Sequence, residues 1–178
     1  MRLFVAIELP RRVREALWNE ARKLGKNWRS GRLLPPESYH ITLSFLGQQP
    51  EHRLESITAA MDRCHCPPFQ ATLGELGLFD QRGGGVLWRG VWSPELSRLQ
   101  SQLARQLEQA GFALEKRPFQ PHITLARRVA LDLETDLAAL TVSAQSFGVE
   151  EMVLMRSRLS QQGASYQGLY RSSFRRTQ

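Results

Sequence analysis

The chain of 178 residues is 42% hydrophobic and 8% aromatic, which is enough to bury a core and excludes a largely disordered protein. Nowhere do about 18 apolar residues run together, so we expect no membrane span, and the apolar run that ends at Pro10 is too short for a signal peptide. The net charge of +7, carried mostly by arginine, favours polyanionic partners such as nucleic acid, although a general bias toward arginine would give the same balance.

In the first half of the chain, the spacing of apolar residues predicts two strands and two helices. Residues 3–8 (LFVAIE) are largely apolar, as in a buried strand. After Pro10, apolar residues recur at helical spacing until Gly25 ends the helix. The β-branched and apolar run HITLSFL predicts a strand over 40–46, and a second amphipathic helix is expected to start near Pro50.

The second half begins with two predicted strands, over 69–79 and 86–92, joined by the flexible sequence DQRGGG. Ser93, Pro94 and Glu95 then form a good helix start, with a hydroxyl cap, a proline in the first turn and an acid at the positive end of the helix. Leucines at helical spacing continue this helix until Gly111. We expect a strand over 122–126, a short helix near 133–140, and strands around 145–158 and 166–174.

This order of elements predicts an α+β fold with a single domain over residues 1–178. Each half contains an amphipathic helix followed by a strand that begins His-Ile-Thr-Leu, at 40–43 and again at 122–125. The repetition indicates an internal duplication, and therefore a bilobal molecule with pseudo-twofold symmetry. We expect two antiparallel sheets that line a central cleft, with the helices outside.

The repeated motif places a histidine beside a threonine. Side chains two positions apart share a face of a strand, so His40 and Thr42 point one way, as do His122 and Thr124, while the isoleucines and leucines between them point into a core. If the lobes pack about a twofold axis, both polar faces line one cleft. One imidazole can then take a proton from a nucleophile while the other gives a proton to a leaving oxygen, and the hydroxyls can hold phosphate oxygens.

These histidines have two alternative uses. A single His-x-Thr strand is more often structural, but two copies in corresponding halves favour a function, because a shared fold alone would preserve only the apolar pattern. Metal binding is disfavoured, because no Asp, Glu or Cys lies in either strand and two histidines leave a catalytic zinc one ligand short. We expect no metal and no cofactor. Cys64 and Cys66 are too close in sequence to close a large loop, which fits a reducing cytoplasmic compartment.

Four segments together give the sequence a resemblance to a known family: RLFVAIELP, YHITLSFLG, RPFQPHITLAR and SRLSQQGASYQGLY. They resemble the two-histidine (2H) phosphoesterases, and among them the bacterial and archaeal RNA 2′,3′-cyclic phosphodiesterases, also called 2′-5′ RNA ligases. The resemblance covers nearly the whole chain. It implies a bilobal α+β fold with the active site between two antiparallel sheets, no metal, and a substrate RNA that carries a 2′,3′-cyclic phosphate end.

The family extends its motifs to HxTxxF and HxTxxR, and all six positions are matched here. The resemblance implies a product with a 2′-phosphate and a role for each side chain. His40 would be the general acid that protonates the departing ribose O3′, and His122 would be the general base that activates water. Thr42, Thr124 and Arg127 would bind the phosphate, and Phe45 would stack on the terminal base.

Several points stay open at the level of sequence. Phe45 and Arg127 lie five positions after their histidines, an odd offset that strict alternation sends to the opposite face, so a bulge, a strong twist or a strand end must intervene in each motif. The acid and base can be exchanged, because the motifs are nearly symmetric. Reversible joining or cleavage of 2′-5′ RNA linkages, opening of a small cyclic nucleotide, and non-catalytic RNA binding are the alternative functions. We expect a cytoplasmic monomer.

Overall fold

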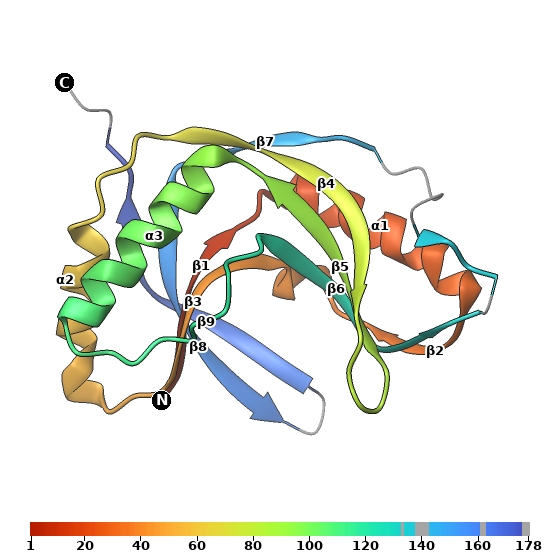
Figure 1. Ribbon diagram of the computed structural model, residues 1–178, viewed down its shortest axis with the longest axis horizontal. Helices are drawn as coiled ribbons and strands as arrows, with labels where there is room; N and C mark the ends of the chain where they lie inside the picture. The colour runs from red at the N-terminus through yellow and green to blue at the C-terminus, as the bar shows by residue number, and fades with distance from the viewer. Residues whose placement is uncertain (133, 138–142, 161–162, 176–178) are drawn as a thin grey trace.

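The computed structural model describes residues 1–132, 134–137, 143–160 and 163–175, and it confirms the predicted α+β class (Figure 1). The helices are α1 (Arg11–Leu24), α2 (Leu54–Asp62) and α3 (Pro94–Gln109). The strands are β1 (Arg2–Glu8), β2 (Trp28–Leu33), β3 (His40–Gln48), β4 (Phe69–Phe79), β5 (Gly85–Trp92), β6 (His122–Leu131), β7 (Ser146–Val149), β8 (Glu151–Ser160) and β9 (Gly163–Ser173). None of the helices described here is long and apolar enough to cross a membrane.

The strands pair in the order β7-β4-β5-β6-β3-β1-β8-β9. Strand β2 also pairs with β6, along the same edge that pairs with β3. These pairings are antiparallel. The two sheets expected from the sequence are therefore the two halves of one nine-stranded sheet. Strands β3 and β6 join these halves through one backbone pair, Ile41 on β3 with Ile123 on β6. Each of these isoleucines directly follows the histidine of its motif, so the junction of the halves brings the two motifs together.

Helices α1 and α3 each pack against the half of the sheet that does not contain the strand preceding them in sequence. Helix α1 follows β1 in sequence but packs against β2 and β6, whereas α3 follows β5 but packs against β3 and α2. The apolar stripes of both helices are buried, and Ser93 Oγ caps α3 by accepting a hydrogen bond from the Leu96 amide at 3.4 Å, as the sequence predicted. Because the helices cover the outer face, the opposite face of the sheet is left for a ligand.

A buried ion pair ties α1 to the sheet. Arg89 on β5 is fully buried, and its Nη1 lies 3.3 Å from the Glu20 carboxylate on α1. Its Nη2 donates to the Ser143 carbonyl at 2.8 Å. Burial lowers the pKa of Arg89 and raises the pKa of Glu20, and in each case the partner's charge opposes the effect of burial only in part. The pair therefore depends on each member keeping the other charged.

Three features differ from the elements predicted by sequence. Strand β2 was not predicted. The strand expected around 145–158 is divided at Glu150 into β7, which pairs with β4, and β8, which pairs with β1. Residues 133 and 138–140 of the short helix expected near 133–140 lie outside the described residues.

Candidate active site

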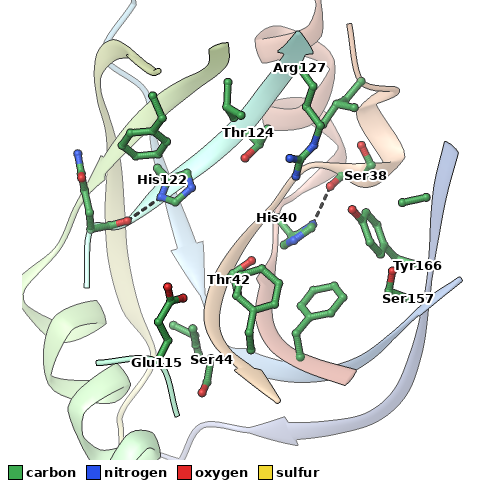
Figure 2. A pocket seen from close by; sticks show the side chains of 18 of the residues that line it. Ser38, His40, Thr42, Ser44, Glu115, His122, Thr124, Arg127, Ser157 and Tyr166 are labelled. Atoms are coloured by element: carbon green, nitrogen blue, oxygen red, sulfur yellow. Dashed lines mark hydrogen bonds between the residues drawn. The ribbon is translucent and has the colours of Figure 1, made fainter. Parts of the chain in front are cut away.

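All six candidate site residues from the sequence line one cleft of about 1530 Å³. Figure 2 shows His40 and His122 on opposite sides of this cleft, with Thr42, Thr124 and Arg127 directed into it. The sixth residue, Phe45, is 55% exposed on the same cleft wall as His40. Two segments far apart in the chain thus supply one set of polar side chains.

The pairing of Ile41 with Ile123 explains how the four motif side chains are arranged. In an antiparallel pair, the residue before Ile41 lies across from the residue after Ile123, so His40 is opposite Thr124 and, by the same rule, Thr42 is opposite His122. All four point away from the core that buries the isoleucines. The two strands pair at this one position and diverge on either side of it, which leaves room between the imidazoles for a substrate.

A bulge in each motif turns the side chain of its sixth residue, Phe45 or Arg127, into the cleft. Along β3, Val5 pairs with Ser44 and Ala6 with Thr42, so Leu43 is the extra residue. Along β6, Leu87 pairs with Ala126 and Trp88 with Thr124, so Leu125 is the extra residue. A bulge shifts the alternation by one position. Phe45 and Arg127, which strict alternation would send to the outer face, therefore join the histidines on the cleft face.

Both imidazoles are held by the same local hydrogen bond. His40 Nδ1 lies 2.7 Å from the Ser38 carbonyl oxygen, and His122 Nδ1 lies 2.7 Å from the Gln120 carbonyl oxygen (Figure 2). A carbonyl can only accept, so this contact assigns the proton of each ring to Nδ1. In the neutral ring Nε2 is then a free base, and in the charged ring it carries the proton that can be given away.

Aromatic side chains pack around each imidazole. The His40 ring lies 4.9 Å from the Phe4 ring and 5.0 Å from the Tyr166 ring, measured between centroids. The His122 ring lies 5.1 Å from the Phe79 ring. These residues were not singled out from the sequence, because aromatic residues in strands read as ordinary core. Their place in the fold shows instead that they hold the imidazoles in orientation.

The electrostatics of His40 differ from those of an exposed histidine. Burial, together with the nearby His122 and Arg127, lowers its pKa from 6.5 to about 4, although the hydrogen bond to Ser38 and the Glu8 carboxylate oppose this shift. His40 is therefore neutral at pH 7 while the cleft holds no anion. A phosphate group that enters the cleft adds negative charge beside the ring and raises its pKa again.

The charged side chains that line the cleft are more often basic than acidic. Five arginines and three carboxylates line it, namely Arg2, Arg32, Arg117, Arg127, Arg128, Asp80, Glu108 and Glu115. Over the described part of the chain, no three His, Cys, Asp or Glu side chains gather so that they could hold a metal ion. The arrangement is thus suited to an anion held between two groups that exchange protons.

Comparison with known proteins agrees with this geometry. Residues 9–161 match the 2′-5′ RNA ligase superfamily. An RNA 2′,3′-cyclic phosphodiesterase from Thermus thermophilus is 36% identical over 188 aligned positions, which cover 98% of this chain and 91% of that protein. One from Archaeoglobus fulgidus is 32% identical over 175 positions, which cover 95% and 98%.

The chain belongs to the 2′-5′ RNA ligase superfamily. This confirms the resemblance to the 2H phosphoesterases that the two motifs indicated. Solved structures of similar proteins share the fold: TT0787 of Thermus thermophilus has a TM-score of 0.83 at 32% identity, and Escherichia coli LigT complexed with 3′-AMP has a TM-score of 0.80 at 28% identity. Each alignment covers 98% of both chains. The superfamily fold thus extends over the segments that carry both motifs.

Proposed function

We propose that the protein is an RNA 2′,3′-cyclic phosphodiesterase that opens the cyclic phosphate at an RNA 3′ end to give a 2′-phosphate. The observation that carries this proposal is the pair of imidazoles that face one cleft, each with Nδ1 bonded to a carbonyl and Nε2 directed at the site. The curated relatives named RNA 2′,3′-cyclic phosphodiesterases support it. On this proposal the two lobes of residues 1–178 act as one catalytic unit.

The proposed reaction moves one proton at each side of the phosphorus atom. Nε2 of His122 takes a proton from a water molecule as the water oxygen forms a bond to phosphorus. The bond from phosphorus to O3′ breaks, and Nε2 of His40 gives its proton to O3′. Each positioned acid or base of this kind accelerates a reaction by about 10²–10⁴-fold. The free ring nitrogens and the opposed positions of the two histidines support one acid and one base, and the choice of His40 as the acid follows the resemblance to the family.

The other three cleft side chains stabilise the phosphate. The hydroxyls of Thr42 and Thr124 donate to its non-bridging oxygens, and the guanidinium of Arg127 neutralises the charge that grows on them as water attacks. Such donors are fixed before the reaction begins, because β3 is paired along its length with β1, and β6 with β5. In the proposal, Phe45 stacks on the terminal base, which its exposed ring at the edge of the cleft supports.

The protonation of His40 follows from the charge of the substrate. Its pKa of about 4 in the free protein makes the ring neutral at pH 7. The bound cyclic phosphate raises this pKa, so the ring takes up a proton in the complex and can act as the acid. The charge of His122 lowers the pKa of His40 in the free protein, so the two rings are close enough to influence each other.

The direct test uses an oligoribonucleotide that ends in a 2′,3′-cyclic phosphate, with EDTA present because the proposal needs no metal. We expect a 2′-phosphate product, and a loss of about 10²–10⁴-fold in kcat for His40→Ala and for His122→Ala. Failure of the native protein to open the ring, or full activity of either variant, would refute the proposal. A ligatable RNA pair, assayed in parallel, distinguishes joining of 2′-5′ linkages, and gel filtration tests the proposed monomer. We place the reaction in the cytoplasm, which the two free cysteines, Cys64 and Cys66, support.

A further inference from the structure

A second, smaller recess opens beside the cleft. It has a volume of about 520 Å³ and is formed by the turn between β4 and β5, at residues 81–84, together with Val86, Arg127 and Arg128 on the neighbouring strands. Gln81, Val86 and both arginines also line the main cleft. The recess is therefore continuous with the site, and Arg127 borders both spaces.

The recess is strongly positive. Arg82, Arg127 and Arg128 line it, and no carboxylate lines it. Among the residues that the structure describes, none of these three guanidinium groups has a carboxylate within salt-bridge distance. An arginine that lacks a protein anion keeps its donors for a ligand, and the planar guanidinium suits phosphate oxygens.

The backbone of the recess is held in a costly conformation. Arg128 has a φ of +55°, in the left-handed region that residues with side chains seldom adopt. Gly84 packs directly against it, and a Cβ on Gly84 would lie 2.7 Å from the Arg128 Cα atom. Only glycine fits at this contact, which fixes the β4–β5 turn against β6. The turn that carries Arg82 is thereby anchored beside the cleft, and strain of this kind gathers at binding sites.

The size of the main cleft also exceeds the needs of one nucleotide. Sites for small molecules typically measure about 300–1,000 Å³, whereas this cleft measures about 1530 Å³ before the recess is added. Arg127 and Arg128 line both the cleft and the recess. A ligand that extends from the cleft into the recess meets guanidinium groups, which favour a further negative charge on that ligand.

We infer that this recess binds the phosphodiester group that precedes the terminal nucleotide, so that the preferred substrate is the end of an oligoribonucleotide and not a cyclic mononucleotide. The inference rests on the proposed function, because it takes the reacting phosphate to lie between the two histidines. Arg127 then contacts the reacting phosphate from one side, and Arg82 and Arg128 hold the phosphate next along the chain.

The test compares three substrates: 2′,3′-cyclic AMP, the dinucleotide ApA with a 2′,3′-cyclic phosphate end, and the same dinucleotide with a neutral methylphosphonate between its nucleosides. The native protein should give a kcat/KM for the charged dinucleotide about tenfold or more above that for the mononucleotide, as expected from one charge-assisted contact. The methylphosphonate should lose most of this gain. A second base contributes equally to both dinucleotides, so their difference isolates the charge.

Two variants and a control locate the effect. Arg82→Gln and Arg128→Asn should each reduce the ratio of kcat/KM for the charged dinucleotide to that for the mononucleotide several-fold, and asparagine is chosen because it tolerates the left-handed backbone. Arg98→Gln, on the exposed face of α3 and away from both spaces, is the matched control. An unchanged ratio in both recess variants, or equal rates on the two dinucleotides, would overturn the inference.

A second measurement separates this inference from the proposed function. The 2′-phosphorylated dinucleotide and its methylphosphonate analogue are titrated against the His40→Ala protein, which reports binding without turnover. Tighter binding of the charged form, lost in the Arg82→Gln background, supports the recess even if no substrate is hydrolysed. Equal affinities for the two forms refute it. Hydrolysis of all three substrates at equal rates would leave the proposed function standing and remove this inference alone.

Discussion

Lowering the pH from 7 to 5 should destabilise the protein through His40. The pKa of this residue is about 4 in the folded protein, against 6.5 for an unperturbed histidine. Between these values the unfolded chain binds a proton that the folded chain does not, so stability falls as the pH falls. Each unit of pKa difference is worth 1.36 kcal/mol, which gives a loss of about 2 kcal/mol between pH 7 and pH 5 and about 3 kcal/mol once the pH is below 4.

The assay is urea unfolding at pH 7, 6 and 5, followed by tryptophan fluorescence. Other groups titrate over this range, so the quantity that matters is the difference between the native protein and His40→Gln. The variant should lose about 2 kcal/mol less than the native protein between pH 7 and pH 5. His52→Gln, which removes an exposed histidine, is the matched control. Equal pH dependence in the native protein and His40→Gln would show that the folded chain does not disfavour the charged ring.

Three further predictions address other residues. Arg127→Gln should raise the pKa of His40 in the free protein, because the guanidinium charge lowers it, and an NMR titration of the imidazole would show no change if the two groups were uncoupled. Phe45→Ala should reduce kcat/KM by about 5–100-fold, the loss of one base stack, and leave the unfolding midpoint unchanged, whereas full activity would remove the proposed stacking. Glu20→Gln should cost about 3 kcal/mol in urea unfolding by leaving Arg89 buried without a partner charge, and a cost under about 1 kcal/mol would contradict the account of this pair.

The sequence predicted those features that depend on local pattern. The alternation of His40 and Thr42, and of His122 and Thr124, follows from strand geometry alone, and it gave the polar faces of both motifs. The start of α3 at Ser93 was equally local, since the cap, the proline and the acid lie within three positions. The repeated motif also indicated that two sheet halves meet, because two lobes related by a twofold axis would turn both polar faces toward one cleft.

Features that depend on pairing between distant segments could not be predicted. Strand β2 has exposed residues at four consecutive positions and no alternation, and it is a strand because the edge of β6 beyond Ile123 is free to pair with it. Glu150 separates strands that belong to opposite ends of the sheet, although the sequence around it reads as one β-rich run. The aromatic contacts of Tyr166 with His40 likewise require β9, which is far away in the chain.

The bulges were only half predictable. The odd offset of Phe45 and Arg127 required an irregularity in each strand, and the resemblance to the family gave the reason to require it. The positions of the two bulges, at Leu43 and Leu125, are set by the register with the neighbouring strands β1 and β5. Two consecutive buried residues after each threonine are the visible mark of the extra residue. A periodic pattern alone cannot separate such a mark from the end of a strand.

The position of β1 has a consequence for synthesis of the chain on the ribosome. This strand emerges first and pairs with β3 soon afterwards, but its other edge is completed by β8, at residues 151–160. Until that segment leaves the exit tunnel, an apolar edge centred on Val5 stays open to pairing with other nascent chains. A translational pause while residues 151–160 are still inside the exit tunnel should therefore increase aggregation, whereas a delay after release of the full chain should not.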